Sequence, residues 1–154
     1  DDAIVVNIQG DEPLLQPEMI DSLVQILQEN IDVPMATLAY PETDRKDLLD
    51  PDIVKVVLDS KGRALYFSRS PIPAFRDESS PPPYYKHLGF YAYRNWFLQE
   101  FTKLSPGVLE KSEKLEQLRA LEHGFSISVV ITPSDSISVD TAEDLARVRK
   151  IMEQ

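Results

Sequence analysis

The sequence predicts a three-layer α/β/α domain with a mixed, mainly parallel sheet and one antiparallel hairpin. Apolar runs typical of buried strands alternate along the chain with segments whose apolar residues recur at helical spacing. The exception is the pair of runs 53–58 and 63–67. They are joined by the turn-forming sequence Asp-Ser-Lys-Gly at 59–62 and therefore predict a hairpin. We find no internal repeat and no internal domain boundary in the 154 residues.

The first predicted strand covers residues 3–8 and ends in a polar turn. Its apolar residues show no alternation with polar ones, as in a strand that is covered on both faces. Gly10 permits a backbone turn, and Pro13 cannot continue the strand. Asp11 is therefore expected at the carboxyl end of a strand, the edge at which open α/β sheets bind ligands.

The elements up to residue 85 follow from local patterns. A helix is predicted from Gln16, with a proline in its first turn. Its apolar stripe consists of Ile20, Leu23, Val24 and Leu27. A short strand over 35–39 precedes an acidic loop over 40–52 that has room for one helical turn. After the hairpin, residues 68–85 contain five prolines and are expected to lack regular structure.

The next part of the chain predicts one strand and two helices. A strand over 87–94 leads into a helix capped by Asn95. A second helix is expected over 112–123, where leucines recur on one side and Gly124 stands in the usual position after a helix end.

The chain closes with a strand over 126–131 and an amphipathic helix. That helix is expected to begin at Asp140, with Glu143 three residues later as its capping-box partner. Its apolar side consists of Leu145, Val148, Ile151 and Met152.

The composition excludes several classes of function. The net charge of −10 argues against binding to nucleic acid or to anionic membranes. No apolar run approaches the ~20 residues of a membrane span. With no cysteine, the chain has neither disulfides nor thiolate metal sites, so we expect a cytoplasmic protein. A small anionic substrate is compatible with this charge where a few Arg, Lys or metal ions gather in one pocket.

Two aspartates are candidate magnesium ligands. Asp11 follows the first strand and Asp140 precedes the closing helix, so both are expected near the ligand edge of the sheet. Carboxylate oxygens, together with water and phosphate, are what a Mg²⁺ ion requires. From position alone, Asp140 is better explained as a helix N-cap, and Asp11 is as well explained by a turn as by a metal site.

Three further residues are candidates for binding substrate. Gln9 ends an apolar strand, where its amide could read the edge of a base or be a satisfied core amide. Arg69 stands where a strand enters the proline-rich segment, and its guanidinium suits a carboxylate, although an exposed loop arginine is the more common case. His87 begins a strand, where a structural, hydrogen-bonded role is the more common one.

A cluster of acid and amide groups lies in the second half of the chain. Glu113, Glu116 and Gln117 fall within one helical turn and could together hold several sugar hydroxyls. A solvated helix face is the usual explanation of such a cluster. The chain contains no Gly-rich phosphate loop, no Ser-His-Asp order and no metal-binding histidine pair.

Five motifs that span nearly the whole chain carry a resemblance to one enzyme family. They are Asn7-Ile-Gln-Gly-Asp-Glu-Pro13, Tyr66-Phe-Ser-Arg-Ser-Pro-Ile-Pro73, Tyr85-Lys-His-Leu-Gly-Phe-Tyr-Ala-Tyr-Arg94, Glu113-Lys-Leu-Glu-Gln-Leu-Arg119 and Val139-Asp-Thr-Ala-Glu-Asp-Leu145. In this order they resemble successive motifs of the 3-deoxy-manno-octulosonate cytidylyltransferases, the CMP-Kdo synthetases. The resemblance implies the nucleotide-diphospho-sugar transferase fold, which is like that of glycosyltransferase A.

The resemblance also implies an activity and a set of roles. The reaction transfers CMP from CTP to Kdo, requires Mg²⁺ and releases pyrophosphate, and its product CMP-Kdo serves lipopolysaccharide synthesis. Asp11 and Asp140 correspond to the metal ligands and catalytic carboxylates, and Gln9 corresponds to a nucleotide contact. The residues that correspond to the sugar pocket are Arg69, His87, Glu116 and Gln117. Glu113 is the alternative to Glu116.

One motif of the family has no counterpart in the chain. It is an N-terminal Gly- and Arg-bearing loop that ends in Leu-Pro-Gly-Lys-Pro and holds the CTP phosphates. A segment that helps to recognise cytosine is not found either. We therefore expect residues 1–154 to be the C-terminal part of a single cytidylyltransferase domain and to be inactive alone.

The resemblance further implies a homodimer, with residues 84–101 as the expected contact. Two alternatives stay open. The chain could belong to a cytidylyltransferase for another acidic sugar, such as sialic acid. It could also be a non-catalytic binding or scaffold module that keeps the fold.

Overall fold

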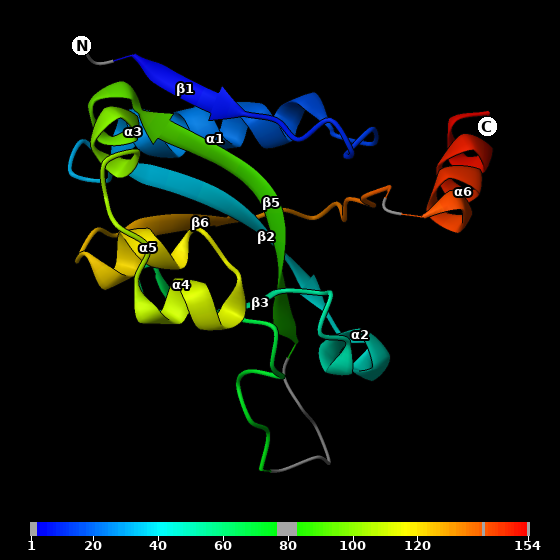
Figure 1. The fold of residues 1–154 in the computed structure, drawn as a ribbon. Helices are drawn as coiled ribbons and strands as arrows, with labels where there is room; N and C mark the ends of the chain where they lie inside the picture. The colour runs from blue at the N-terminus through cyan, green and yellow to red at the C-terminus, as the bar shows by residue number, and fades with distance from the viewer. Residues whose placement is uncertain (1–2, 77–82, 140, 154) are drawn as a thin grey trace.

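The computed structural model describes residues 3–76, 83–139 and 141–153. Its strands are β1 (Ile4–Asn7), β2 (Met35–Glu42), β3 (Lys55–Leu58), β4 (Ala64–Ser68), β5 (Tyr84–Arg94) and β6 (Ile127–Ile131). Its helices are α1 (Pro17–Glu29), α2 (Arg45–Leu49), α3 (Asn95–Phe101), α4 (Val108–Glu113), α5 (Leu118–Glu122) and α6 (Ala142–Met152) (Figure 1).

The strands form one mixed sheet in the order β4-β3-β5-β2-β6, and β1 also pairs with β5. The α/β class and the hairpin of β3 and β4 are confirmed. The parallel share of the sheet is smaller than expected, because the described strands include one parallel pair, β2 with β6. The reason is β5, which runs antiparallel to β1, β2 and β3 and lies between them. Its apolar pattern carries no information about its direction, since a strand that is buried on both faces reads alike in either sense.

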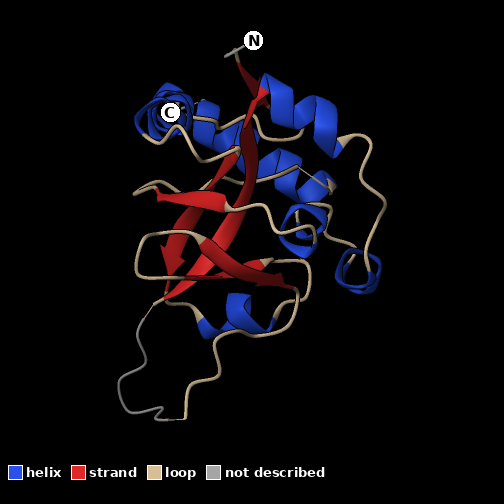
Figure 2. Ribbon diagram, turned by 90° about the vertical axis from the view of Figure 1, so that its left-hand side faces the viewer, coloured by secondary structure: helices blue, strands red, loops and turns tan. Residues whose placement is uncertain are grey.

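Helices cover both faces of the sheet, as the three-layer prediction requires. On one face α1 packs through Met19, Leu23 and Leu27 against apolar residues of β2 and β5. On the other face, side chains of α3 and α5 pack against β3, β4 and the opposite side of β5. Figure 2 shows the strands with helices on both faces of the sheet.

Several element boundaries differ from the prediction by a few residues. The strand predicted over 35–39 continues as β2 to Glu42, and α2 supplies the helical turn expected in the loop that follows. The strand predicted from His87 begins at Tyr84. Within 68–85, the described residues 69–76 and 83 contain no helix or strand, and residues 77–82 lie outside the described part of the chain.

The helix predicted over 112–123 is two helices, α4 and α5, which are separated by a break at Lys114. This residue has a left-handed backbone with φ of 56°. The break turns the side chains of Leu115 and Gln117 inward, where each is 6% exposed. Burial of these two residues therefore overrides the good local helix propensity of the segment.

Two helix starts also differ from the prediction. The N-cap of α3 is Arg94, so Asn95 is the first residue of the helix. The capping box of α6 joins Thr141 and Asp144, one residue later than the expected pair of Asp140 and Glu143. Asp144 accepts a hydrogen bond from the Thr141 amide at 2.9 Å, and Thr141 accepts one from the Asp144 amide at 3.2 Å.

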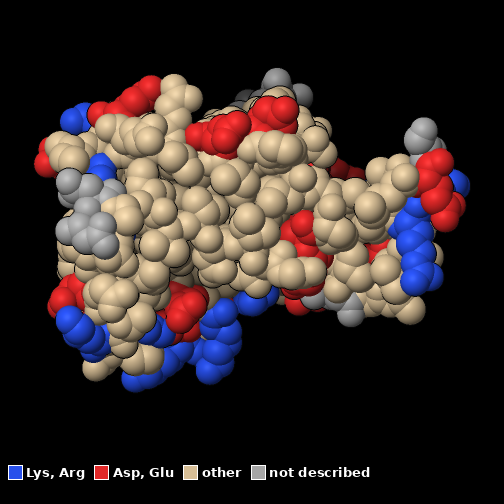
Figure 3. All heavy atoms as spheres, turned by 90° about the horizontal axis from the view of Figure 1, so that it is seen from above, with Lys and Arg blue, Asp and Glu red and all other residues tan. Residues whose placement is uncertain are grey.

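The closing helix α6 projects from the rest of the domain (Figure 1). Of its predicted apolar side, Val148 is buried, whereas Leu145, Ile151 and Met152 are exposed. Seen from above, much of the surface on the side of β1 carries no charged side chain, and the projecting α6 displays both acidic and basic ones (Figure 3). No helix in the described ranges is both long enough and apolar enough to cross a membrane.

Candidate active site

The loop after β1 and the segment after β6 meet at one edge of the sheet. Strands β1 and β2 both run antiparallel to β5, and β6 runs parallel to β2, so the carboxyl ends of β1, β2 and β6 face the same way. The amide of Val139 donates a hydrogen bond of 2.8 Å to the carbonyl of Asp11. The two predicted metal-binding segments are therefore in direct contact. Asp140 itself lies outside the described residues.

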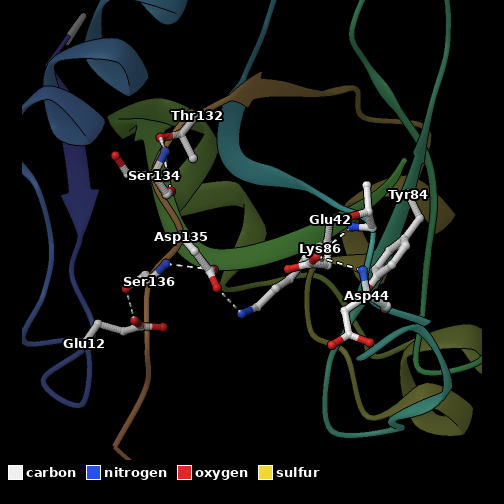
Figure 4. A network of polar contacts seen from close by, with 10 residues as sticks. Glu12, Glu42, Asp44, Tyr84, Lys86, Thr132, Ser134, Asp135 and Ser136 are labelled. Carbon is white, nitrogen blue, oxygen red and sulfur yellow. Dashed lines mark hydrogen bonds and ion pairs between the residues drawn. The ribbon is translucent and has the colours of Figure 1, made fainter. Parts of the chain in front are cut away.

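A chain of polar contacts holds these two segments to β5 (Figure 4). The hydroxyl of Ser136 donates to the carboxylate of Glu12, which follows Asp11. The neighbouring Asp135 forms an ion pair of 2.9 Å with Lys86 of β5. Burial raises the pKa of Glu12, the Ser136 hydrogen bond and Lys86 oppose this rise, and the charges of Asp11 and Asp135 add to it. This network fixes the backbone on which Asp11 stands.

Two predicted residues of the first loop face solvent. Asp11 and Gln9 are both exposed, so Gln9 is not a buried core amide. A cavity of about 410 Å³ lies near this edge, between the first turns of α1 and the end of β6, and none of the predicted site residues lines it. The described residues contain no group of three or more acidic, histidine or cysteine side chains that could hold a metal. An exposed Asp11 carboxylate supplemented by water nevertheless suits the oxygen coordination of Mg²⁺.

A second group of site residues lies beyond the end of β4, around Arg69 and Glu113. The Arg69 guanidinium donates through Nε to the Glu113 carbonyl at 2.9 Å and through Nη1 to the Pro51 carbonyl at 3.0 Å. The Glu113 carboxylate accepts from the Arg69 amide at 3.0 Å and from the Ser68 hydroxyl at 2.7 Å. Tyr66 also donates to this carboxylate, at 3.2 Å.

Among the described residues Arg69 forms no ion pair, and both acceptors of its guanidinium are neutral carbonyls, although its charge acts on the nearby Glu113 carboxylate. Burial opposes ionisation of Glu113, but the hydrogen bonds from Arg69, Ser68 and Tyr66, together with the charge of Arg69, outweigh it and lower the Glu113 pKa. Glu113 is thus an ionised anchor of the Arg69 backbone. The guanidinium remains able to bind an incoming carboxylate.

The structure therefore brings Glu113, rather than Glu116, to Arg69. The side chain of Glu116 is 72% exposed and forms an ion pair of 3.5 Å with Arg119. Its charge adds to the effects of burial and of Tyr93 in raising the pKa of Tyr91. Gln117 is buried. The assignment of Glu116 and Gln117 to a sugar pocket stays a prediction.

His87 lies in an aromatic pocket on the face of the sheet that α3 and α5 cover. Its ring is 4.9 Å from that of Phe67 and 5.5 Å from that of Tyr91, measured between centroids. Its Nε2 lies 2.9 Å from the Thr37 hydroxyl oxygen, and this hydroxyl is also 2.7 Å from the Phe90 carbonyl. A carbonyl can only accept, so the single hydroxyl proton goes to Phe90 and Nε2–H donates to Thr37. The Nδ1 atom of His87 is then the hydrogen-bond acceptor of a neutral ring.

Burial lowers the pKa of His87 to about 3, which makes a stability prediction. The ordinary histidine pKa is about 6.5, so between these values the unfolded state binds more protons than the folded state. We expect the free energy of unfolding to fall as the pH drops from about 6.5 towards about 3. Urea unfolding over this range should show a smaller fall for His87→Gln than for the exposed control His123→Gln. Equal pH dependence in the two variants would contradict a His87 that is neutral in the folded protein.

Comparison with known proteins identifies the family. A model of the family described as cytidylyltransferase matches residues 1–134. This chain belongs to the cytidylyltransferase family. The 3-deoxy-manno-octulosonate cytidylyltransferase of Syntrophobacter fumaroxidans is 57% identical over 152 residues, which are 98% of this chain and 61% of that protein. The same-named protein of Syntrophus aciditrophicus is 53% identical, over 99% of this chain and 61% of its own length.

Solved structures agree with this family assignment. A CMP:2-keto-3-deoxy-manno-octonic acid synthetase in complex with CTP superposes with a TM-score of 0.92 at 38% identity, covering 98% of this chain and 62% of that one. A glucose-1-phosphate thymidylyltransferase from Bacillus anthracis, described as putative, has a TM-score of 0.60 at 14% identity, which shows a shared fold alone. The chain thus spans about three fifths of the length of its cytidylyltransferase relatives. The names of these relatives confirm the family resemblance of the five motifs.

Proposed function

We propose that this chain forms part of an enzyme that transfers CMP from CTP to Kdo, giving CMP-Kdo and pyrophosphate. The observation that carries the proposal is the Arg69 guanidinium, which the carbonyls of Pro51 and Glu113 hold without an ion pair, two residues after Phe67, whose ring contacts that of His87. Such a cation suits the carboxylate of an acidic sugar. The names of the curated relatives and of the CTP-bound structure support the same substrates.

In the proposed reaction, a hydroxyl oxygen of the sugar attacks the α-phosphate of CTP in line, the bond from that phosphorus to the bridging oxygen breaks so that pyrophosphate leaves, and the hydroxyl proton passes to water. Arg69 binds the sugar carboxylate, and the Nδ1 atom of His87 accepts a hydrogen bond from a sugar hydroxyl. Asp11 and Asp140 would hold Mg²⁺, which neutralises charge that develops on the phosphate. The contact between Val139 and Asp11 supports this pairing of segments. Gln9, which is exposed next to Asp11, would contact the nucleotide.

The assembly and location of the enzyme are part of the proposal. We expect a cytoplasmic homodimer that supplies CMP-Kdo for lipopolysaccharide synthesis. Within the expected contact 84–101, Phe97 and Phe101 are buried in the core of this chain, whereas Trp96 is 48% exposed. Trp96 is therefore the residue of this segment best placed to meet a second subunit.

The test is product formation by the protein in two forms. We call this chain, completed to the length of its curated relatives, the extended protein. With CTP and Mg²⁺, the extended protein should form CMP-Kdo, and residues 1–154 alone should not. A panel of Kdo and sialic acid separates the proposed substrate from the alternative acidic sugar. Turnover of sialic acid in preference to Kdo would contradict the proposal, and no turnover of either sugar would favour the binding-module alternative.

A further inference from the structure

Lys55 is the first residue of β3 and has no surface exposure. Its ammonium group donates three hydrogen bonds, all to backbone carbonyls. The acceptors are the carbonyls of Asp50 at 2.8 Å, Ile53 at 2.5 Å and Arg69 at 2.6 Å. An ammonium carries three protons, so its hydrogen-bonding capacity is fully used.

No carboxylate contributes to this arrangement directly. Burying an ammonium group is costly, and neutral carbonyls compensate its charge less than a carboxylate would. Burial lowers the Lys55 pKa, Asp50 opposes this effect, Arg69 adds to it and Glu113 opposes it again. The cross-strand partners of Lys55 are Ser68 of β4 and Lys86 of β5, and Ser68 is also buried. A buried ammonium group that reaches no carboxylate therefore calls for an explanation.

The three carbonyls connect Lys55 to the backbone of Arg69 and to the turn that carries one of the two acceptors of its guanidinium. One belongs to Arg69 itself and fixes the backbone from which the side chain extends. The other two, of Asp50 and Ile53, flank Pro51, whose carbonyl accepts from Nη1 of Arg69. Lys55 therefore holds the base of the arginine side chain and the turn that orients its tip.

We propose that Lys55 is a positioning residue that sets the orientation of the Arg69 guanidinium for the sugar carboxylate. The proposal rests on the proposed function, because it requires that Arg69 binds an acidic sugar. Lys55 does not contact the substrate. It acts through Arg69 and through the 50–53 turn.

The test measures KM for Kdo and for CTP in the extended protein. Lys55→Met leaves three carbonyls without their donor, so the KM for Kdo should rise by about 10-fold or more, while the KM for CTP stays the same. Lys61→Met is the matched control, since Lys61 is exposed in the turn between β3 and β4, and it should change neither value. In the Arg69→Ala background, Lys55→Met should add little further rise, because the group through which it acts is already gone.

Each other outcome has a defined meaning. Equal rises in both KM values, or a Lys55→Met effect that is undiminished in the Arg69→Ala background, would overturn the proposal in favour of a general structural role. If Lys55→Met does not fold, Lys55→Gln, which keeps two N–H donors, replaces it. Loss of folding in both variants would also overturn the proposal. Failure of the proposed function is recognised separately, because Arg69→Ala would then leave the KM for Kdo unchanged.

Discussion

Replacing Asp11 with Asn is expected to lower CMP-Kdo formation by the extended protein by about 10³-fold, because a metal ligand contributes several kcal/mol of charge stabilisation. The substitution keeps the size of the side chain and the backbone carbonyl that accepts from Val139. The fold should therefore be preserved. Initial rates over a Mg²⁺ titration measure the effect, and the variant should also need more Mg²⁺ for half-maximal rate.

The matched control is Asp21→Asn, since Asp21 is an exposed aspartate on α1. It removes the same charge and should leave both the rate and the Mg²⁺ requirement unchanged. Asp140→Asn should resemble Asp11→Asn. Mg²⁺-dependent nucleotide binding that survives both substitutions together would contradict the metal assignment.

Replacing Arg69 with Ala is expected to raise the KM for Kdo by about 100-fold, since a hydrogen-bonded contact with a charged group contributes up to about 3 kcal/mol. The KM for CTP should stay the same, because Arg69 lies with Glu113 and Pro51 rather than beside Asp11. Steady-state kinetics with each substrate varied in turn give both values.

Arg63→Ala is the control for this substitution. Arg63 is exposed in the same hairpin and forms an ion pair of 2.9 Å with Asp59. Its removal should change neither KM. An Arg69→Ala variant with the KM for Kdo of the unmodified protein would remove the basis of the sugar site.

Local sequence patterns predicted the elements whose signals are local. The strand before Gly10, the hairpin turn at 59–62 and the start of α1 at Pro17 depend on nearby residues only, and the structure has all three. The same holds for the placement of Asp11 at the carboxyl end of β1. However, β1 is half-buried rather than covered on both faces as predicted. Asp140 was expected at the same edge from its place before the closing helix. It lies outside the described residues, and the contact of Asp11 with Val139 brings the adjoining residue to this edge.

The prediction failed where distant residues decide the local structure. The segment around Lys114 has good helix propensity, and its break depends on the burial of Leu115 and Gln117 in a core built by other elements. That break also decides which acid reaches Arg69. Helical spacing placed Glu113 and Glu116 on one face, and it could not show that Glu113 alone meets Arg69.

Lys55 was not predicted for a related reason. A lysine at the start of a strand usually reaches solvent, and its burial depends on three carbonyls, of which the one from Arg69 is 14 residues away. The role of Thr37 in setting the tautomer of His87 joins residues 50 positions apart. Neither contact has a signal in a single sequence.

The most direct test of the account compares Kdo with an analogue in which a carboxamide replaces the carboxylate. The quantity is the ratio of kcat/KM for the two sugars, measured in the extended protein with and without Arg69→Ala. We expect a strong preference for Kdo that Arg69→Ala abolishes, because the guanidinium is the group that recognises the negative charge. An equal preference in both proteins would contradict the assignment of Arg69 as the carboxylate-binding residue, and with it the central claim of an acidic-sugar site in this chain.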